Sequence, residues 1–118
     1  MTSLIACLTT GKGGWAHVSE LMASTDWEIT FLITNDFGVQ NFKSTKKFEF
    51  IVINPDASLQ EIKSSIMVQL KGKIKDLEVA VNLASGSGKE HMALLSAALN
   101  LGLGVRIVEV DNGKMVVL

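Results

Sequence analysis

The sequence contains a single cysteine, Cys7, so a disulfide bond within the chain is excluded. Cys7 lies in the apolar run at residues 4–8, which favours a small buried core residue over a reactive thiol. This first apolar run is too short for a signal peptide and lacks its basic flank. We therefore expect a cytoplasmic protein.

Long apolar runs and an excess of charge are also absent. No run approaches the roughly 18 residues of a membrane-spanning helix, so no membrane association is expected. The formal net charge is −1, whereas a general DNA- or RNA-binding protein usually carries a strong basic excess. The charge argues against general DNA binding and leaves a local basic site open. The 118 residues have the size of one domain, which we place at residues 1–118.

Apolar runs alternate with segments of helical spacing. Strands are expected at residues 4–8, 29–33, 48–53, 77–83, 105–110 and 115–118. Helices are expected at residues 15–22, 59–72 and 89–101, and residues 36–47 leave room for one short helix. This alternation predicts an α/β fold: a Rossmann-like three-layer sandwich whose mainly parallel six-stranded sheet is closed by a C-terminal antiparallel β-hairpin.

The helix from Met92 to Leu101 is apolar nearly all round, with Ser96 and Asn100 as its only polar residues. Such a helix is buried on two sides, one of them against the sheet. Its other side is covered either by a neighbouring helix or by a second subunit. We favour a homodimer through this helix, because so short a chain has few other helices to cover it. The 47% apolar content agrees with a buried interface.

A glycine–serine loop, NLASGSGKEHM at residues 82–92, precedes this helix. Ser87 and Glu90 have the spacing of a capping box, so the helix is expected to begin at about Gly88. Its first turn leaves backbone N–H groups free beside small residues, and Lys89 adds a positive charge. The loop is therefore predicted to bind phosphate. The expected contacts are Ser85, Gly86, Ser87, Gly88, Lys89 and His91.

A second loop, TTGKGGW at residues 9–15, follows the first strand and has a similar composition. With strand order 3-2-1-4, strands one and four are neighbours, and ligands bind outside their carboxyl ends. The two loops would then face each other across a phosphate cleft built from N–H groups, hydroxyls and two lysines. The expected contacts from this loop are Thr9, Thr10, Gly11, Lys12 and Gly13. Asn35 and Asp36, after the second strand, are expected to contact ribose or adenine.

Two other kinds of site are tested by the same residues. A Walker A motif fails, because Leu83 stands where its first glycine belongs and Glu90 follows Lys89. His17 and His91 follow the two loops, and two histidines beside a buried cysteine make a metal site unexpected. No metal or cofactor is predicted.

A dinucleotide-binding pattern is met in part. Gly11, Gly13 and Ala16 satisfy G-x-G-x-x-A, and Asp36 ends the second strand about where a ribose-binding acid would lie. A small domain for NAD or a mononucleotide therefore stays open as an alternative. So does a non-catalytic dimerisation or interaction module that uses the apolar helix.

Residues 82–118 resemble the C-terminal half of a CARF domain, the CRISPR-associated Rossmann fold. The family has a strand, an N-x-[ST]-G-G-T-K-like loop, an Ala/Leu-rich helix and a β-hairpin. Here ASGSGK at residues 84–89 replaces the more usual TGGTK, with the lysine, the small residues and the helix retained. TTGKGG is similar to the family's other ligand loop, whereas residues 36–47 are shorter than the expected helical crossover.

The resemblance implies a homodimer that binds a cyclic oligoadenylate, the second messenger of type III CRISPR antiviral defence. We expect a single-domain member without an effector, and some such members are ring nucleases. These cut the bound ring without a metal, as each 2′-hydroxyl attacks its neighbouring phosphate. The resemblance gives Lys89 the role of the cation at the transition state and Thr10, or Thr9, that of holding a phosphate. Passive binding and slow cleavage both remain open.

Overall fold

The computed structural model of the chain describes residues 2–8 and 12–118, without the side chains of Lys12 and Gly13. Its strands are β1 (Leu4–Cys7), β2 (Thr30–Thr34), β3 (Phe48–Val52), β4 (Glu78–Asn82), β5 (Gly104–Asp111) and β6 (Lys114–Val117). Its helices are α1 (Lys12–Ser24), α2 (Asp36–Asn41), α3 (Leu59–Leu70) and α4 (Gly88–Asn100). The strands form one sheet in the order β3-β2-β1-β4-β5-β6. All neighbours are parallel except β5 and β6, which are antiparallel.

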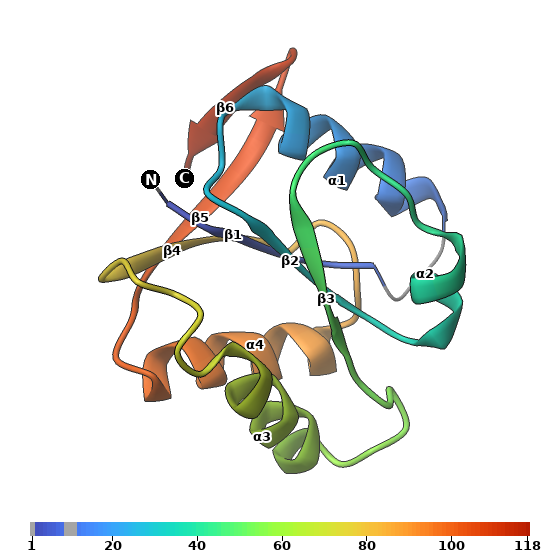
Figure 1. Cartoon of the computed structure of the whole chain (residues 1–118), viewed down its shortest axis with the longest axis vertical. Coiled ribbons are helices and arrows are strands. Elements are labelled where there is room, and N and C mark those ends of the chain that lie inside the picture. Colours follow the sequence, from blue (N-terminus) through green and yellow to red (C-terminus); the bar gives the residue numbers. More distant parts are fainter. Residues whose placement is uncertain (1, 9–11) are drawn as a thin grey trace.

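The strand order and the closing hairpin confirm the sequence prediction of a mainly parallel six-stranded sheet. In Figure 1, α1 lies on one side of the sheet and α3 with α4 on the other. Side chains alternate between these two sides along β1: Leu4 and Ala6 join the core beneath α1, and Ile5 and Cys7 join the core beneath α3 and α4. All four are fully buried, which explains why the strand reads as a continuous apolar run.

Two helix beginnings follow the capping signals in the sequence. Ser87 and Glu90 form the predicted capping box, in which Glu90 N–H donates to Ser87 Oγ (3.3 Å) and Ser87 N–H donates to Glu90 Oε1 (2.8 Å). The helix therefore begins at Gly88, as expected. Ser58 caps α3 by accepting from the N–H of Glu61. By contrast, α1 begins at Lys12, three residues before the predicted start at Trp15.

The second side of α4 is covered in part by a neighbouring helix, because α3 packs along it. Ala93, Ala97 and Ala98 are fully buried, whereas the side chains of Met92 and Leu99 are 59% and 64% exposed. A neighbouring helix, α3, thus covers part of the second side of α4. A subunit interface over the rest of that side stays a prediction. No helix in the described part of the chain is long and apolar enough to cross a membrane.

Candidate functional site

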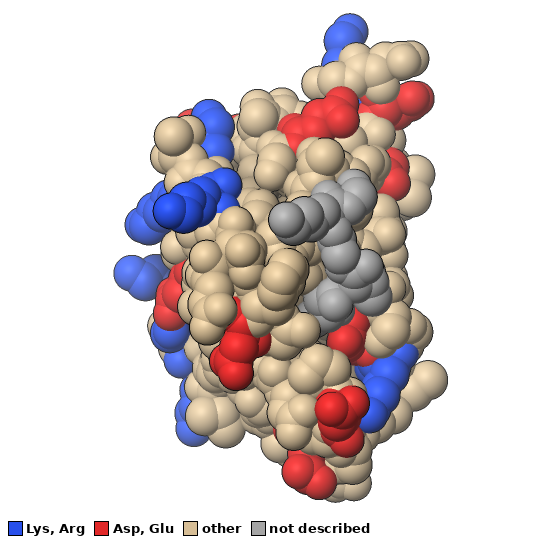
Figure 2. Space-filling model, turned by 90° about the vertical axis from the view of Figure 1, so that its right-hand side faces the viewer, with Lys and Arg blue, Asp and Glu red and all other residues tan. Residues whose placement is uncertain are grey.

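The first turn of α1 and the loop after β4 meet at the carboxyl edge of the sheet. β1 and β4 are adjacent, with Ala6 opposite Asn82, and the first turn of α1 touches the glycine–serine loop. A Cβ atom added to Gly14 would lie 2.6 Å from Ser85 Oγ, so only glycine permits this approach. Figure 2 shows one face of the molecule, on which groups of both charge signs are scattered among uncharged ones.

Ser85 is the most unusual residue at this contact. It is 2% exposed, and its hydroxyl has no hydrogen-bond partner among the described residues. Burying an unsatisfied hydroxyl costs about 1–3 kcal/mol. The hydroxyl lies beside Gly14 at the beginning of α1, where the N–H groups of a helix favour an anion. A ligand oxygen bound at this helix end would satisfy it.

Gly86 lets the loop cross directly over the end of β1. Its φ is +102°, and an added Cβ would lie 2.8 Å from Cys7 Cβ. The ring Nε2 of His91 is 2.8 Å from Ser85 O, so α4 holds the loop from its other side. Burial, with a smaller effect from the charge of Glu90, raises the pKa of Cys7 to about 12. The thiol is therefore neutral, as expected for a core residue.

Ser87, Gly88 and Lys89 form the start of α4. Ser87 Oγ already accepts a hydrogen bond as the helix cap. The hydroxyl of Ser87 is therefore less available for a ligand than its sequence position suggests. An added Cβ at Gly88 would meet nothing within 4 Å, which leaves the helix end open to approach. Lys89 is exposed, and its Nζ donates to Pro55 O (3.2 Å) in the turn after β3. An exposed hydrogen bond of this kind is exchanged for a phosphate at little cost.

The two ligand contacts predicted after β2 differ in their roles: one side chain caps a helix, and the other is exposed at the surface. Asn35 accepts from Gly38 N–H (3.1 Å) and so caps α2, while Asp36 is exposed in the first turn. Both lie near the carboxyl end of β2, at the same edge of the sheet as the two loops. Thr9, Thr10 and Gly11 lie outside the described residues, and so do the side chains of Lys12 and Gly13.

Trp15 and His17 have partners within the fold. The indole N–H of Trp15 donates to Leu8 O (2.8 Å), and its ring contacts those of Phe37 and Phe42. Trp15 is buried and therefore belongs to the core packing. The ring Nε2 of His17 contacts Glu109 Oε1 of β5 within hydrogen-bond distance.

Asn82 and Glu109 are two residues that the sequence analysis missed. Asn82 is 2% exposed, and its side chain donates to Val108 O (2.8 Å) and accepts from Ala84 N–H (3.1 Å). It thus fixes the first residues of the glycine–serine loop. The only sequence signal was an asparagine at the end of an apolar strand, where an unpaired side chain would be costly.

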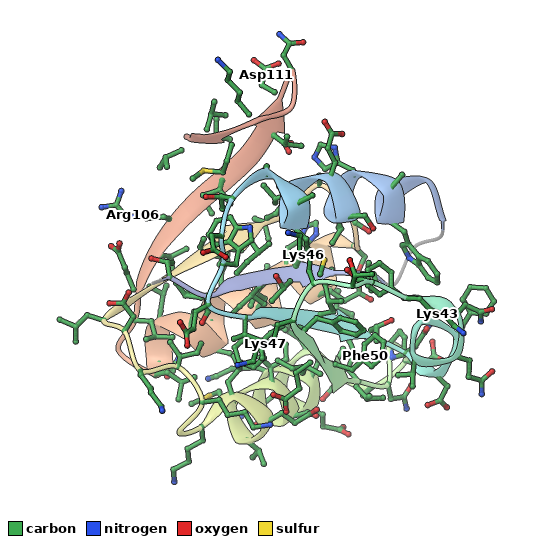
Figure 3. The ribbon with its side chains drawn as sticks, turned by 45° about the horizontal axis from the view of Figure 1, so that its top comes forward. Lys43, Lys46, Lys47, Phe50, Arg106 and Asp111 are labelled. Carbon is green, nitrogen blue, oxygen red and sulfur yellow. The ribbon has the colours of Figure 1, made fainter. Side chains whose placement is uncertain are left out.

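A hollow lies at the opposite edge of the sheet. Its volume is about 690 Å³, and its charged lining consists of Glu28, Lys47, Glu49, Lys73, Lys75 and Asp76. Acidic and basic side chains are equal in number there, so the hollow has no charge preference for phosphate. Figure 3 also shows Lys43 beside α2 and well apart from Lys47. The basic segment before β3 therefore does not converge on one anion site.

Thr34 provides a test of how a buried hydroxyl without a hydrogen-bond partner affects stability. Its Oγ1 is buried at the end of β2 without a partner among the described residues, beneath Gly38. We expect Thr34→Val to raise the free energy of unfolding by about 1 kcal/mol, because the penalty of the unpaired hydroxyl disappears at similar volume. Urea unfolding measures the change. A loss of stability would show that the hydroxyl has a partner such as bound water.

Comparison with known proteins concerns the fold. No family model and no curated protein matches the sequence. The structure is similar to that of Enterococcus italicus Csm6 bound to cyclic hexa-2′-fluoro-hexa-dAMP, with a TM-score of 0.63 and 14% sequence identity. The match covers 95% of this chain and 34% of that one, so the chain spans about a third of the Csm6 length. At this identity the likeness shows the fold alone: the chain has a Rossmann-like α/β fold.

Proposed function

We propose that this protein binds a cyclic oligoadenylate in the cleft between the loops after β1 and β4. The observation that carries the proposal is Ser85, whose hydroxyl is buried without a partner where the two loops touch. Two facts support this ligand. The loop motif resembles that of CARF domains, and the similar Csm6 structure holds a ring of six adenylate analogues. A ring of phosphodiesters presents anionic oxygens of the kind that a helix N-terminus accepts.

The described half of the cleft supplies three kinds of phosphate contact. The first turn of α4 offers N–H groups at the open side of Gly88, Ser85 offers its hydroxyl, and Lys89 offers an ammonium group. Gly86, Ser87 and His91 shape this loop, and their own contacts to the ligand would be mainly through the backbone. From the facing loop we assign contacts to Thr9, Thr10, Gly11, Lys12 and Gly13, and from the end of β2 to Asn35 and Asp36.

The proposal includes a homodimer through α4. Met92 and Leu99 expose apolar surface on this helix. They adjoin a groove of about 370 Å³ between α3 and α4, lined by Leu59, Gln60, Lys63, Met92, Ala93 and Ser96. A second copy would cover this surface and place two clefts on one ring. Light scattering after size exclusion is expected to give twice the 12.7 kDa of one chain.

Slow, metal-independent cleavage of the ring is part of the same proposal. The 2′-oxygen attacks the adjacent phosphorus, the bond to the 5′-oxygen breaks, and the proton of the 2′-hydroxyl ends on that leaving oxygen. The products are linear chains with 2′,3′-cyclic phosphates. The transition state carries extra negative charge, which Lys89 would stabilise while Thr10 holds the phosphate in line. The protein would then act in the cytoplasm to end a type III CRISPR antiviral signal.

Incubation with cyclic tetra-adenylate and cyclic hexa-adenylate tests the proposal. Calorimetry is expected to show binding of one ring, and chromatography is expected to show whether linear products form. Binding without products would reduce the activity to that of a receptor. Failure to bind either ring, with thermal stabilisation by NAD instead, would overturn the proposal in favour of a dinucleotide-binding domain.

A further inference from the structure

Glu109 on β5 lies between the two elements that carry the candidate loops. One atom, Glu109 Oε1, accepts hydrogen bonds from the ring of His17 on α1, from Val110 N–H (2.8 Å) and, at 3.4 Å, from Asn82 Nδ2 at the end of β4. The side chain is about one-third exposed. A single carboxylate oxygen thus contacts both the helix after the first loop and the strand before the second.

Each of these contacts leads within a few residues to the cleft. His17 lies one turn after Gly14, the residue of α1 that touches Ser85. Asn82 accepts from Ala84 N–H (3.1 Å), directly before Ser85. Glu109, the first turn of α1 and the glycine–serine loop therefore form a closed circuit of contacts. The Gly14–Ser85 contact and the Glu109 hydrogen bonds both join α1 to the segment that carries the glycine–serine loop.

We infer that Glu109 is a positioning residue, which sets the distance between the two phosphate-binding loops and thereby the affinity of the cleft for its ligand. The inference rests on the proposed function. It assigns Glu109 no contact with the ligand and no part in the chemistry. Charge-assisted hydrogen bonds are well suited to this role because they are shorter and stronger than neutral ones.

The ionisation of Glu109 supports this role. Burial raises the pKa of Glu109, but the hydrogen bonds from Val110 N–H, His17 and Asn82 together lower it below its usual value. The carboxylate is therefore charged at neutral pH. In Figure 3, Asp111 lies at the tip of the hairpin and Arg106 lies further back along β5. Arg106 forms its own ion pair with Glu78 of β4, with Nε 2.9 Å from Oε2.

The ion pair between Arg106 and Glu78 supplies a matched control. Glu78→Gln weakens an ion pair between the same two strands at the amino end of β4, away from both loops. The test compares Glu109→Ala, Glu109→Gln, His17→Ala and Glu78→Gln by calorimetry with cyclic tetra- and hexa-adenylate. Amide hydrogen exchange in the ligand-free proteins reports the loop directly, because Asn82 holds the N–H of Ala84.

We expect Glu109→Ala to weaken binding about tenfold and to speed exchange at residues 84–88. Glu109→Gln keeps an oxygen acceptor at the Oε1 position and should recover binding to within about threefold of the wild type. His17→Ala should give a partial loss, and the double variant of His17 and Glu109 should bind no worse than Glu109→Ala alone. Glu78→Gln should change neither measurement.

The results separate this inference from the proposed function. If the wild type binds a ring and both Glu109→Ala and His17→Ala bind equally well, the inference is wrong while the function stands. If the wild type binds neither ring, the proposed function fails, and the exchange rates alone decide. Faster loop exchange in Glu109→Ala and His17→Ala than in Glu78→Gln supports the positioning role, and equal rates in these variants would overturn it. His17→Ala keeps the test valid if Glu109→Ala does not fold.

Discussion

Replacing Lys89 with alanine is expected to slow cleavage of the bound ring by about a hundredfold and to weaken binding by about tenfold. Removing one group that stabilises transition-state charge typically costs a factor of 10² or more in rate. Loss of a ground-state phosphate contact costs less, since about 1.4 kcal/mol corresponds to a factor of ten. The side chain is exposed, so the free energy of unfolding should stay within about 0.5 kcal/mol of the wild type. Calorimetry and single-turnover chromatography measure the two effects separately.

Lys73→Ala is the control for this experiment. Lys73 is also largely exposed, and it pairs with Glu49 at the opposite edge of the sheet. Both variants change the net charge by the same amount, so a general electrostatic attraction of the ring would weaken equally in both. The proposed role of Lys89 requires a loss in its own variant alone. Equal losses would show that Lys89 has no specific place in the cleft.

The strands of the sheet and the helices could be predicted from the sequence because they depend on local patterns. Residues 4–8 are a continuous apolar run, and a strand with such a run is buried on both faces in a parallel sheet. The capping residues Ser58 and Ser87 then fixed the beginnings of α3 and α4, the second of them through a full capping box. Residues 36–47 were least readable, because α2 is only six residues long and depends on the side chain of Asn35 for its cap.

Only the composition of the candidate site could be predicted from the sequence. Glycine, serine and lysine in two loops indicated a phosphate cleft, but those patterns do not tell which side chains the fold itself uses. Asn35 and Ser87 were predicted ligand contacts and are helix caps, since both side chains accept backbone N–H groups. The contact between Gly14 and Ser85 and the hydrogen bond from Asn82 to Glu109 join distant residues, so only the folded chain reveals them.

Ser85→Ala is expected to have effects of opposite sign on stability and on binding. In the ligand-free protein the buried hydroxyl is unsatisfied, so its removal should raise the free energy of unfolding by about 1 kcal/mol. With ligand present the same hydroxyl would donate to a charged phosphate oxygen, a bond worth about 1.5–3 kcal/mol. Affinity should therefore fall by about tenfold to a hundredfold. Urea unfolding and calorimetry on one preparation give both values.

A gain in stability together with a loss of affinity is what identifies a ligand-binding residue. A serine that serves only the fold loses stability when it is replaced, whereas one held ready for a ligand gains it, as functional sites are often stabilised at the expense of function. Thr34→Val is the matched control, because Thr34 also buries an unpaired hydroxyl but does so beneath Gly38 rather than beside the first turn of α1. Both variants should be more stable than the wild type, and only Ser85→Ala should bind more weakly. If Ser85→Ala keeps full affinity, the phosphate does not reach the contact between the two loops, and the cleft must lie further out along the start of α4.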